Sequence, residues 1–214
     1  MPVPPVNPPP PPPPPVDPVP PPPPPPATAP VCTGLFVCNT GVGVKLMNPA
    51  LTAAVSSSYL NGVYSITGAG NISTSASYNH YFKYMPLTGN FIMTAKLTSQ
   101  GGSSTGARAG LLATDSLSGS GVYAWTARYA NTGEIRRAIN GDNKSVLSDY
   151  STTTLPVWVR IERRGNALYS AASRDGLTWT EATSVSVSAT ATTLYVGMAV
   201  SSGSNTASQG GGLN

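Results

Sequence analysis

The chain has 214 residues, 9% of them charged, and a formal net charge of +4. One histidine and two cysteines all but exclude a zinc, haem or iron–sulfur site held by several protein ligands. No apolar run approaches the ~20 residues that span a bilayer, and the cations form no concentrated basic patch of the kind that binds nucleic acid.

The first 30 residues hold 20 of the 23 prolines. Proline fixes φ and has no backbone donor, so residues 1–30 are predicted to form a polyproline II arm of about 80–90 Å. Two roles stay open for it: a spacer, or an arm that docks on a partner or a neighbouring subunit. Met1 is followed by neither the basic nor the apolar stretch of a secretory signal, so we expect any export signal to have been removed or another route to be used.

Cys32 and Cys38 are six residues apart, which suits a small disulfide-closed hairpin, with two free thiols as the alternative. A disulfide would place the protein outside the reducing cytosol. Residues 31–61 are predicted to form this hairpin and a connecting segment, with a short helix around Pro49–Ser57.

From Gly62 onward the apolar residues alternate with a period of two. The predicted strands are rich in β-branched and aromatic residues, and Gly, Asn and Asp turns separate them. They cover Asn79–Met85, Asn90–Thr98, Ala107–Asp115, Val122–Tyr129, Glu134–Ile139, Val157–Arg163, Ala167–Ala172, Ser184–Ser188 and Thr193–Ser201. This pattern predicts an all-β domain, an antiparallel sandwich or barrel, over residues 62–202.

Several segments of this domain carry a family resemblance. They are Tyr84–Gly89, Ala107–Leu112, Pro156–Ile161, Ser173–Thr180 and Tyr195–Val200. Together they resemble the concanavalin A-like jelly-roll modules of the DUF1349-like group, which are appended to bacterial secreted polysaccharide enzymes and cell-surface proteins. The resemblance implies an antiparallel jelly-roll β-sandwich and an extracellular or cell-surface location.

The end of the chain departs from that family, whose modules usually finish on a strand of the form T-A-x-F-D-N-V. Residues 203–214 are rich in Gly and Ser and show no strand pattern, so we expect a tail there. The last strand of the sandwich would then come from another chain or from an earlier segment around Cys32–Lys45.

The segment Ser173–Thr180 is similar to the Asp-box of sialidases, with one residue missing between Asp175 and Gly176. Asp-boxes are structural hairpins. We therefore expect Asp175-Gly176 to form a turn with Trp179 packed beneath it.

Carbohydrate is bound by exposed aromatic rings together with polar side chains, which makes five residues candidates for a ligand site. Val157, Val159 and Ile161 form one apolar face, so Trp158 and Arg160 are predicted to point away from the core. For Val122–Tyr129 the sequence does not show which alternate residues face the core, because both sets are compatible with burial. Core packing is therefore the alternative role for its rings. The candidates are Tyr123, Trp125, Tyr129, Trp158 and Arg160.

No catalytic or metal site is predicted. The acids after Asp17 are scattered, His80 has no recognisable nucleophile partner, and the E-x-D-x-E signature of laminarinase-type enzymes is absent. Calcium commonly braces jelly rolls, and Asp142-Asn143 with Asp149 offer oxygens for it, but a loop turn explains them as well.

The sequence therefore predicts a non-catalytic extracellular module that binds a polysaccharide or a cell-surface glycan, or serves in display or adhesion. The alternative is a structural subunit of an extracellular filament, sheath or virion surface whose N-terminal arm clasps a neighbouring copy.

Overall fold

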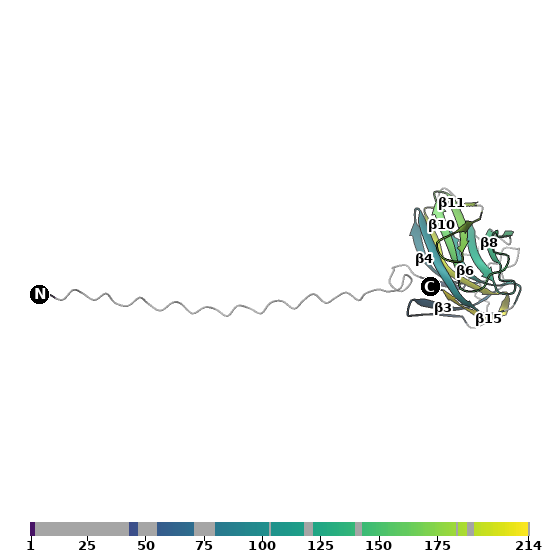
Figure 1. The fold of residues 1–214 in the computed structure, drawn as a ribbon, viewed down its shortest axis with the longest axis horizontal. Coiled ribbons are helices and arrows are strands. Elements are labelled where there is room, and N and C mark those ends of the chain that lie inside the picture. Colours follow the sequence, from purple (N-terminus) through teal and green to yellow (C-terminus); the bar gives the residue numbers. More distant parts are fainter. Residues whose placement is uncertain are drawn as a thin grey trace. The chain divides into compact units, whose positions relative to one another are not determined.

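The computed structural model describes residues 1–2, 43–46, 55–70, 80–102, 104–117, 122–139, 143–182, 184–187 and 191–213. The chain divides into two units, Met1–Val31 and Cys32–Asn214, and every strand among the described residues belongs to the second (Figure 1). The arm beyond its first two residues, the pair Cys32 and Cys38, and residues 49–54 of the expected helix lie outside the described residues.

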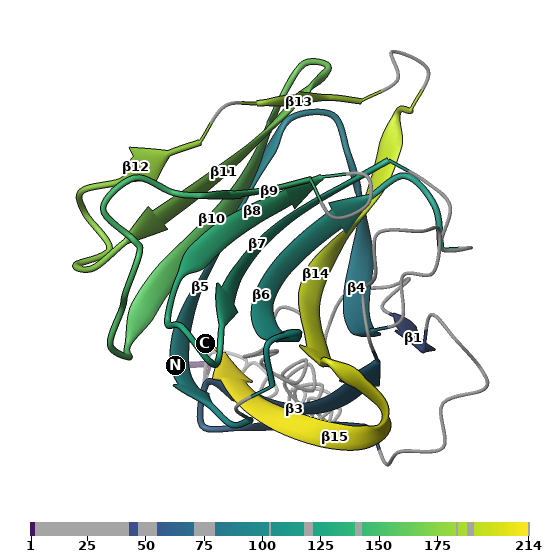
Figure 2. The same ribbon diagram turned by 90° about the vertical axis from the view of Figure 1, so that its right-hand side faces the viewer.

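Two antiparallel sheets make up the second unit, and Figure 2 shows them as two curved layers. The first, sheet A, has seven strands. Their order is β1 (Gly43–Leu46), β4 (Tyr81–Thr88), β14 (Thr193–Ser202), β6 (Ala107–Thr114), β7 (Tyr123–Tyr129), β8 (Ile135–Ile139) and β9 (Asn143–Val146).

The second, sheet B, has eight strands, seven of them in one row. The row is β12 (Thr180–Glu181), β11 (Ala167–Ser173), β10 (Val157–Arg164), β5 (Phe91–Gln100), β15 (Ser204–Leu213), β3 (Val63–Gly70) and β2 (Ser56–Leu60), and β13 (Val185–Ser186) pairs with β11 off this row. The expectation of an all-β antiparallel sandwich is confirmed.

The main core lies between the sheets. Period-two alternation turns one side of each strand inward, as in β10, where Val157, Val159 and Ile161 are fully buried. Leu97 and Leu111 join them from the two sheets in one apolar cluster. Burial of this surface is the main favourable contribution to folding.

The segment expected to be a C-terminal tail is instead strand β15, which lies between β5 and β3. Figure 2 shows β15 running beside β3. A turn at Gly203, with φ of 77°, carries the chain from β14 in sheet A to β15 in sheet B. The chain therefore supplies this strand of the sandwich itself, and β1, from the earlier segment, adds an edge strand to sheet A.

Glycine explains why β15 has no visible pattern in the sequence. A Cβ on Gly212 would stand 2.7 Å from the Ser99 hydroxyl, and one on Gly211 would stand 3.3 Å from the Ala109 methyl. Small residues are needed where the strand packs this closely, and they carry no apolar alternation.

The prediction of a short helix around Pro49–Ser57 is wrong for its last two residues, because Ser56 and Ser57 begin strand β2. β2 and β3 form a hairpin through Asn61 and Gly62, which have φ of 50° and 85°. Two positive φ values match the turn that favours Asn-Gly and suits the twist of paired strands.

Candidate functional site

Strand β10 presents a row of large polar and aromatic side chains on the outer side of sheet B. Its burial alternates along the strand, so Trp158, Arg160 and Glu162 are only partly buried while Val157, Val159 and Ile161 are enclosed. The prediction that Trp158 and Arg160 point away from the core is confirmed.

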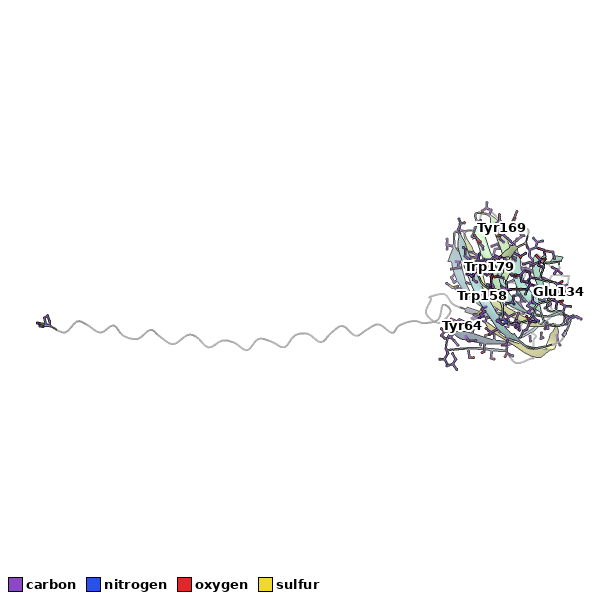
Figure 3. All side chains as sticks on the ribbon, in the orientation of Figure 1. Tyr64, Glu134, Trp158, Tyr169 and Trp179 are labelled. Atoms are coloured by element: carbon purple, nitrogen blue, oxygen red, sulfur yellow. The ribbon has the colours of Figure 1, made fainter. Side chains whose placement is uncertain are left out.

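Three rings on this side of sheet B each carry a cation from the chain itself. Lys96 Nζ lies 5.5 Å from the centre of the Trp158 ring, Arg160 Cζ lies 3.7 Å from Trp179, and Arg164 Cζ lies 4.2 Å from Tyr169. Figure 3 labels the three rings in the part of the molecule built by β10 and β11. We call these residues the outer aromatic face: Trp158, Trp179, Tyr169, Lys96, Arg160 and Arg164.

Strand register brings these residues together. β10 pairs with β5 so that Trp158 is opposite Lys96 and Arg160 is opposite Thr94, and β11 places Tyr169 opposite Glu162. Residues opposite one another in an antiparallel pair share a side of the sheet. The alternation of three neighbouring strands therefore accounts for the outer aromatic face except Trp179, which lies between β11 and β12.

The turn after β11 fixes one end of this face. The Asp175 carboxylate accepts hydrogen bonds from the backbone N–H groups of Thr178 and Leu177, each 2.8 Å long, and from the Ser173 hydroxyl at 2.8 Å. These bonds, led by that of Thr178, hold the pKa of Asp175 well below its usual range.

The ring beneath this turn is Trp158, not Trp179 as expected. A Cβ on Gly176 would lie 3.0 Å from Trp158 Cε2, whereas Trp179 lies against Arg160. Gly176, with φ of 78°, lets the turn approach the indole closely.

The acids of this region are bound by one cation. Arg164 Nε donates to Glu162 Oε1 at 2.7 Å, and its Nη2 donates to Glu162 Oε2 and Glu181 Oε2 at 2.8 Å each. The hydrogen bond from Arg164 lowers the pKa of Glu162, and the bonds to Glu162 and Glu181 raise the pKa of Arg164. Glu162 is therefore held as a carboxylate.

The other three candidate rings lie on sheet A and are buried. Tyr123 is 4% exposed, Trp125 0% and Tyr129 2%. Trp125 packs with Phe82 and Leu112 in a second apolar cluster, on the side of sheet A that faces away from sheet B. Buried rings do not offer a stacking surface, so the expectation of an exposed platform at Tyr123, Trp125 and Tyr129 is corrected to a packing role.

A buried arginine accompanies these rings. Arg108 is 1% exposed, its Nη1 donates to the Tyr129 hydroxyl at 2.5 Å, and its Cζ lies 5.4 Å from the Trp125 ring centre. Burial lowers the pKa of Arg108 and raises that of Tyr129. His80 is also buried, 5.3 Å from Trp125 between ring centres.

No metal or membrane-spanning feature is found in the described parts of the chain. They contain no group of three or more His, Cys, Asp or Glu side chains arranged to hold an ion. Asp142 lies outside them. Nor does any described segment form a helix long and apolar enough to cross a bilayer.

Sequence reasoning missed Lys96, Trp179 and Tyr169 as members of the outer aromatic face. The signal for Lys96 was present, because Ile92, Thr94 and Lys96 alternate with the buried residues of β5 as Trp158 and Arg160 do with those of β10. Lys96 lies beside Trp158 because β5 pairs with β10, and the sequence does not state which strands pair.

No protein-family model matches this chain, and no curated protein does. A functionally unknown protein from Saccharomyces cerevisiae is similar over 81% of this chain and 92% of its own, with a TM-score of 0.62 and 11% identity.

Two further solved structures are similar at low identity. A mutant of the GH43 protein BlXynB from Bacillus licheniformis has a TM-score of 0.52 and 14% identity, over 72% of this chain and 32% of that protein, so the chain spans about a third of its length. The lectin UEA-II, complexed with galactose, has a TM-score of 0.47 and 11% identity, over 81% of this chain and 90% of its own. What this chain shares with the two higher-scoring structures is the fold, an all-β jelly-roll sandwich.

Proposed function

We propose that this protein is a non-catalytic carbohydrate-binding module that acts outside the cell or at its surface. The observation that carries the proposal is the outer aromatic face, where three partly exposed rings and three cations lie on neighbouring strands and, for Trp179, on the segment between β11 and β12. Flat rings beside hydrogen-bond donors are what a sugar requires of a binding surface, since it has apolar faces and a rim of hydroxyls.

Binding at this face needs little rearrangement. Trp158 lies beneath Gly176, and Arg160 Nε donates to the Thr94 hydroxyl at 3.4 Å while its guanidinium lies on Trp179. Side chains already fixed by such contacts lose less conformational entropy when a ligand arrives.

Acid–base chemistry does not fit the same residues. General acid catalysis on a glycosidic bond needs a carboxyl group with a raised pKa. Here Glu162 and Glu181 are both bound by Arg164, and the pKa of Glu162 is lowered. The proposed role is therefore recognition without bond breaking.

The test is retention on a panel of immobilised plant and microbial polysaccharides. We expect wild type to bind at least one of them, and Trp158→Ala and Trp179→Ala to lose that retention while remaining folded by circular dichroism. Leu60→Ala is the matched control, because Leu60 is 72% exposed on β2, outside the outer aromatic face. Retention unchanged in both tryptophan variants, or absent in wild type across the panel, contradicts the proposal.

One observation favours a second function, that of a filament, sheath or virion-surface subunit. Among the described strands, β5 pairs with β10 from Phe91 to Leu97 but with β15 only from Leu97 to Gln100. A groove of about 490 Å³ beside the first half of β5 is lined by Met85, Leu87, Phe91, Ile92, Met93 and Thr94. An unpaired strand edge next to apolar side chains is a place where another chain can add.

The occupant in this second proposal is the proline-rich segment 1–30 of a neighbouring copy. Proline rings suit an apolar groove, and their carbonyl groups accept hydrogen bonds from the free N–H groups of β5. Deleting residues 1–30, or introducing Ile92→Lys, should convert assemblies into monomers by light scattering. Assemblies that survive both changes contradict this function.

A further inference from the structure

The charges on the outer aromatic face are not balanced. Arg164 is bound by Glu162 and Glu181. Among the described residues, neither Arg160 nor Lys96 forms a direct ion pair with a carboxylate. Lys96 lies over Trp158, while Arg160 lies on Trp179, donates to the Thr94 hydroxyl and through its charge helps to lower the pKa of Glu162. Lys96, Arg160 and Arg164 together carry three positive charges against the two negative charges of Glu162 and Glu181, so one positive charge is in excess beside Trp158 and Trp179.

The geometry of Arg160 suits one kind of ligand. Its guanidinium lies on the Trp179 ring with Cζ 3.7 Å from the ring centre, and Nε is occupied by Thr94. The two terminal nitrogens have no described hydrogen-bond partner. A planar guanidinium with two free donors in a fixed orientation matches a carboxylate, which accepts two parallel hydrogen bonds.

Lys96 extends the same charge along the face. Lys96 is opposite Trp158 in the pairing of β5 with β10, and Arg160 is two residues further along β10. The backbones of such diagonal neighbours stand ~7–8 Å apart in an antiparallel pair. Two cations on neighbouring strands can contact charged groups on successive units of one polymer.

The cations also change what the rings can offer. Each of Trp158 and Trp179 has a cation over one face, and Gly176 closes further on Trp158. These contacts reduce the ring surface that is free to stack on an apolar sugar face, and they place positive charge beside the rings. A ligand that brings negative charge gains more here than a neutral one.

From these contacts we infer that the outer aromatic face recognises acidic polysaccharides through the carboxylates of their uronate units, with Arg160 as the carboxylate-binding residue and Lys96 as a second charge contact. This inference rests on the proposed carbohydrate-binding function and names its substrate class. Rings set beside the cations favour a sugar polymer over an acidic peptide, because the sugar supplies flat C–H faces as well as charge.

The experiment uses a matched pair of ligands, polygalacturonate and its methyl ester, which share a sugar backbone and differ in charge. Binding of the full chain is measured by calorimetry at low and high salt. We expect the acid form to bind at least tenfold more tightly than the ester and to weaken as salt rises, since exposed charge contacts are screened.

The variants localise the effect. Arg160→Ala should weaken polygalacturonate binding by about tenfold, the loss of one strong contact, and Lys96→Ala should weaken it by less. Arg136→Ala is the control, because it removes one cation of sheet A, where Arg136 pairs with Glu134, and so changes net charge equally. Equal losses in Arg136→Ala and Arg160→Ala would overturn the inference.

The remaining outcomes separate this inference from the proposed function. Equal binding of the acid and the ester, lost in Trp158→Ala but retained in Arg160→Ala, leaves the carbohydrate function standing and overturns the uronate specificity. Failure of every polysaccharide overturns both. Equally tight binding of polyglutamate or single-stranded DNA shows an unspecific polyanion surface and overturns the uronate assignment.

Discussion

Two tryptophans on different sheets, Trp125 on β7 and Trp158 on β10, show how the environment of a residue decides its role. Trp125 is fully buried on β7 against Phe82 and His80, whereas Trp158 is partly exposed on β10 against Lys96 and Gly176. Both are aromatic residues in a predicted strand, and both were candidates for ligand contact. Only Trp158 lies where a ligand can reach it.

Their alanine variants should therefore differ in stability. We expect Trp125→Ala to lower the free energy of unfolding by about 3–5 kcal/mol, since a large buried side chain leaves a cavity. Trp158→Ala should cost less, because part of its ring already faces solvent. Urea denaturation measures both, and a larger loss for Trp158→Ala would contradict this assignment of environments.

Asp175 gives a residue-scale prediction about pH. Its pKa is lowered in the folded protein by hydrogen bonds led by those of Thr178 and Leu177, relative to about 3.9 in an unfolded chain. A lowered folded-state pKa means that this stabilisation is complete above the unfolded value and is lost as pH falls through the folded value.

The variant Asp175→Asn should consequently melt below wild type at pH 7, and the gap should narrow as pH is lowered from about 5 towards 2. Thermal melts monitored by circular dichroism across that range measure it. A gap that widens at low pH would mean that the carboxylate does not stabilise the turn.

At the scale of the element, β10 and β15 mark the limits of sequence reasoning. The alternation of β10 was readable because one side packs on the core and the other faces outward. The sequence could not show which side of the sheet holds Tyr123, Trp125 and Tyr129. Strand β7 is buried on both sides, so its apolar residues do not alternate with polar ones. β15 was missed because glycines that allow close packing leave no alternation to read.

Strand β15 should nevertheless be essential to the sandwich. Leu213 is fully buried in the main core. Leu213→Ala should lower the free energy of unfolding by about 2–5 kcal/mol, whereas Leu60→Ala, at an exposed leucine on β2, should change it by less than about 0.5 kcal/mol. Similar stabilities for the two variants would contradict the central position of β15.

At the scale of the two-sheet unit, the sandwich separates a buried aromatic cluster on sheet A from the partly exposed rings of the outer aromatic face on sheet B. The fold class could be predicted from the alternation and turn pattern alone. The outer aromatic face could be predicted only in part, since Trp158 and Arg160 were recognised from one strand while Lys96, Tyr169 and Trp179 depend on strand pairing and on the turn after β11.

The three tryptophans of the chain provide the most direct measurement. Their indole N–H signals in a nuclear magnetic resonance spectrum, assigned with single Trp→Phe variants, are followed during titration with a bound polysaccharide. The account predicts saturable shifts of the Trp158 and Trp179 signals while the Trp125 signal stays in place. A shift of Trp125 alone, or binding that moves neither Trp158 nor Trp179, would contradict recognition at the outer side of sheet B.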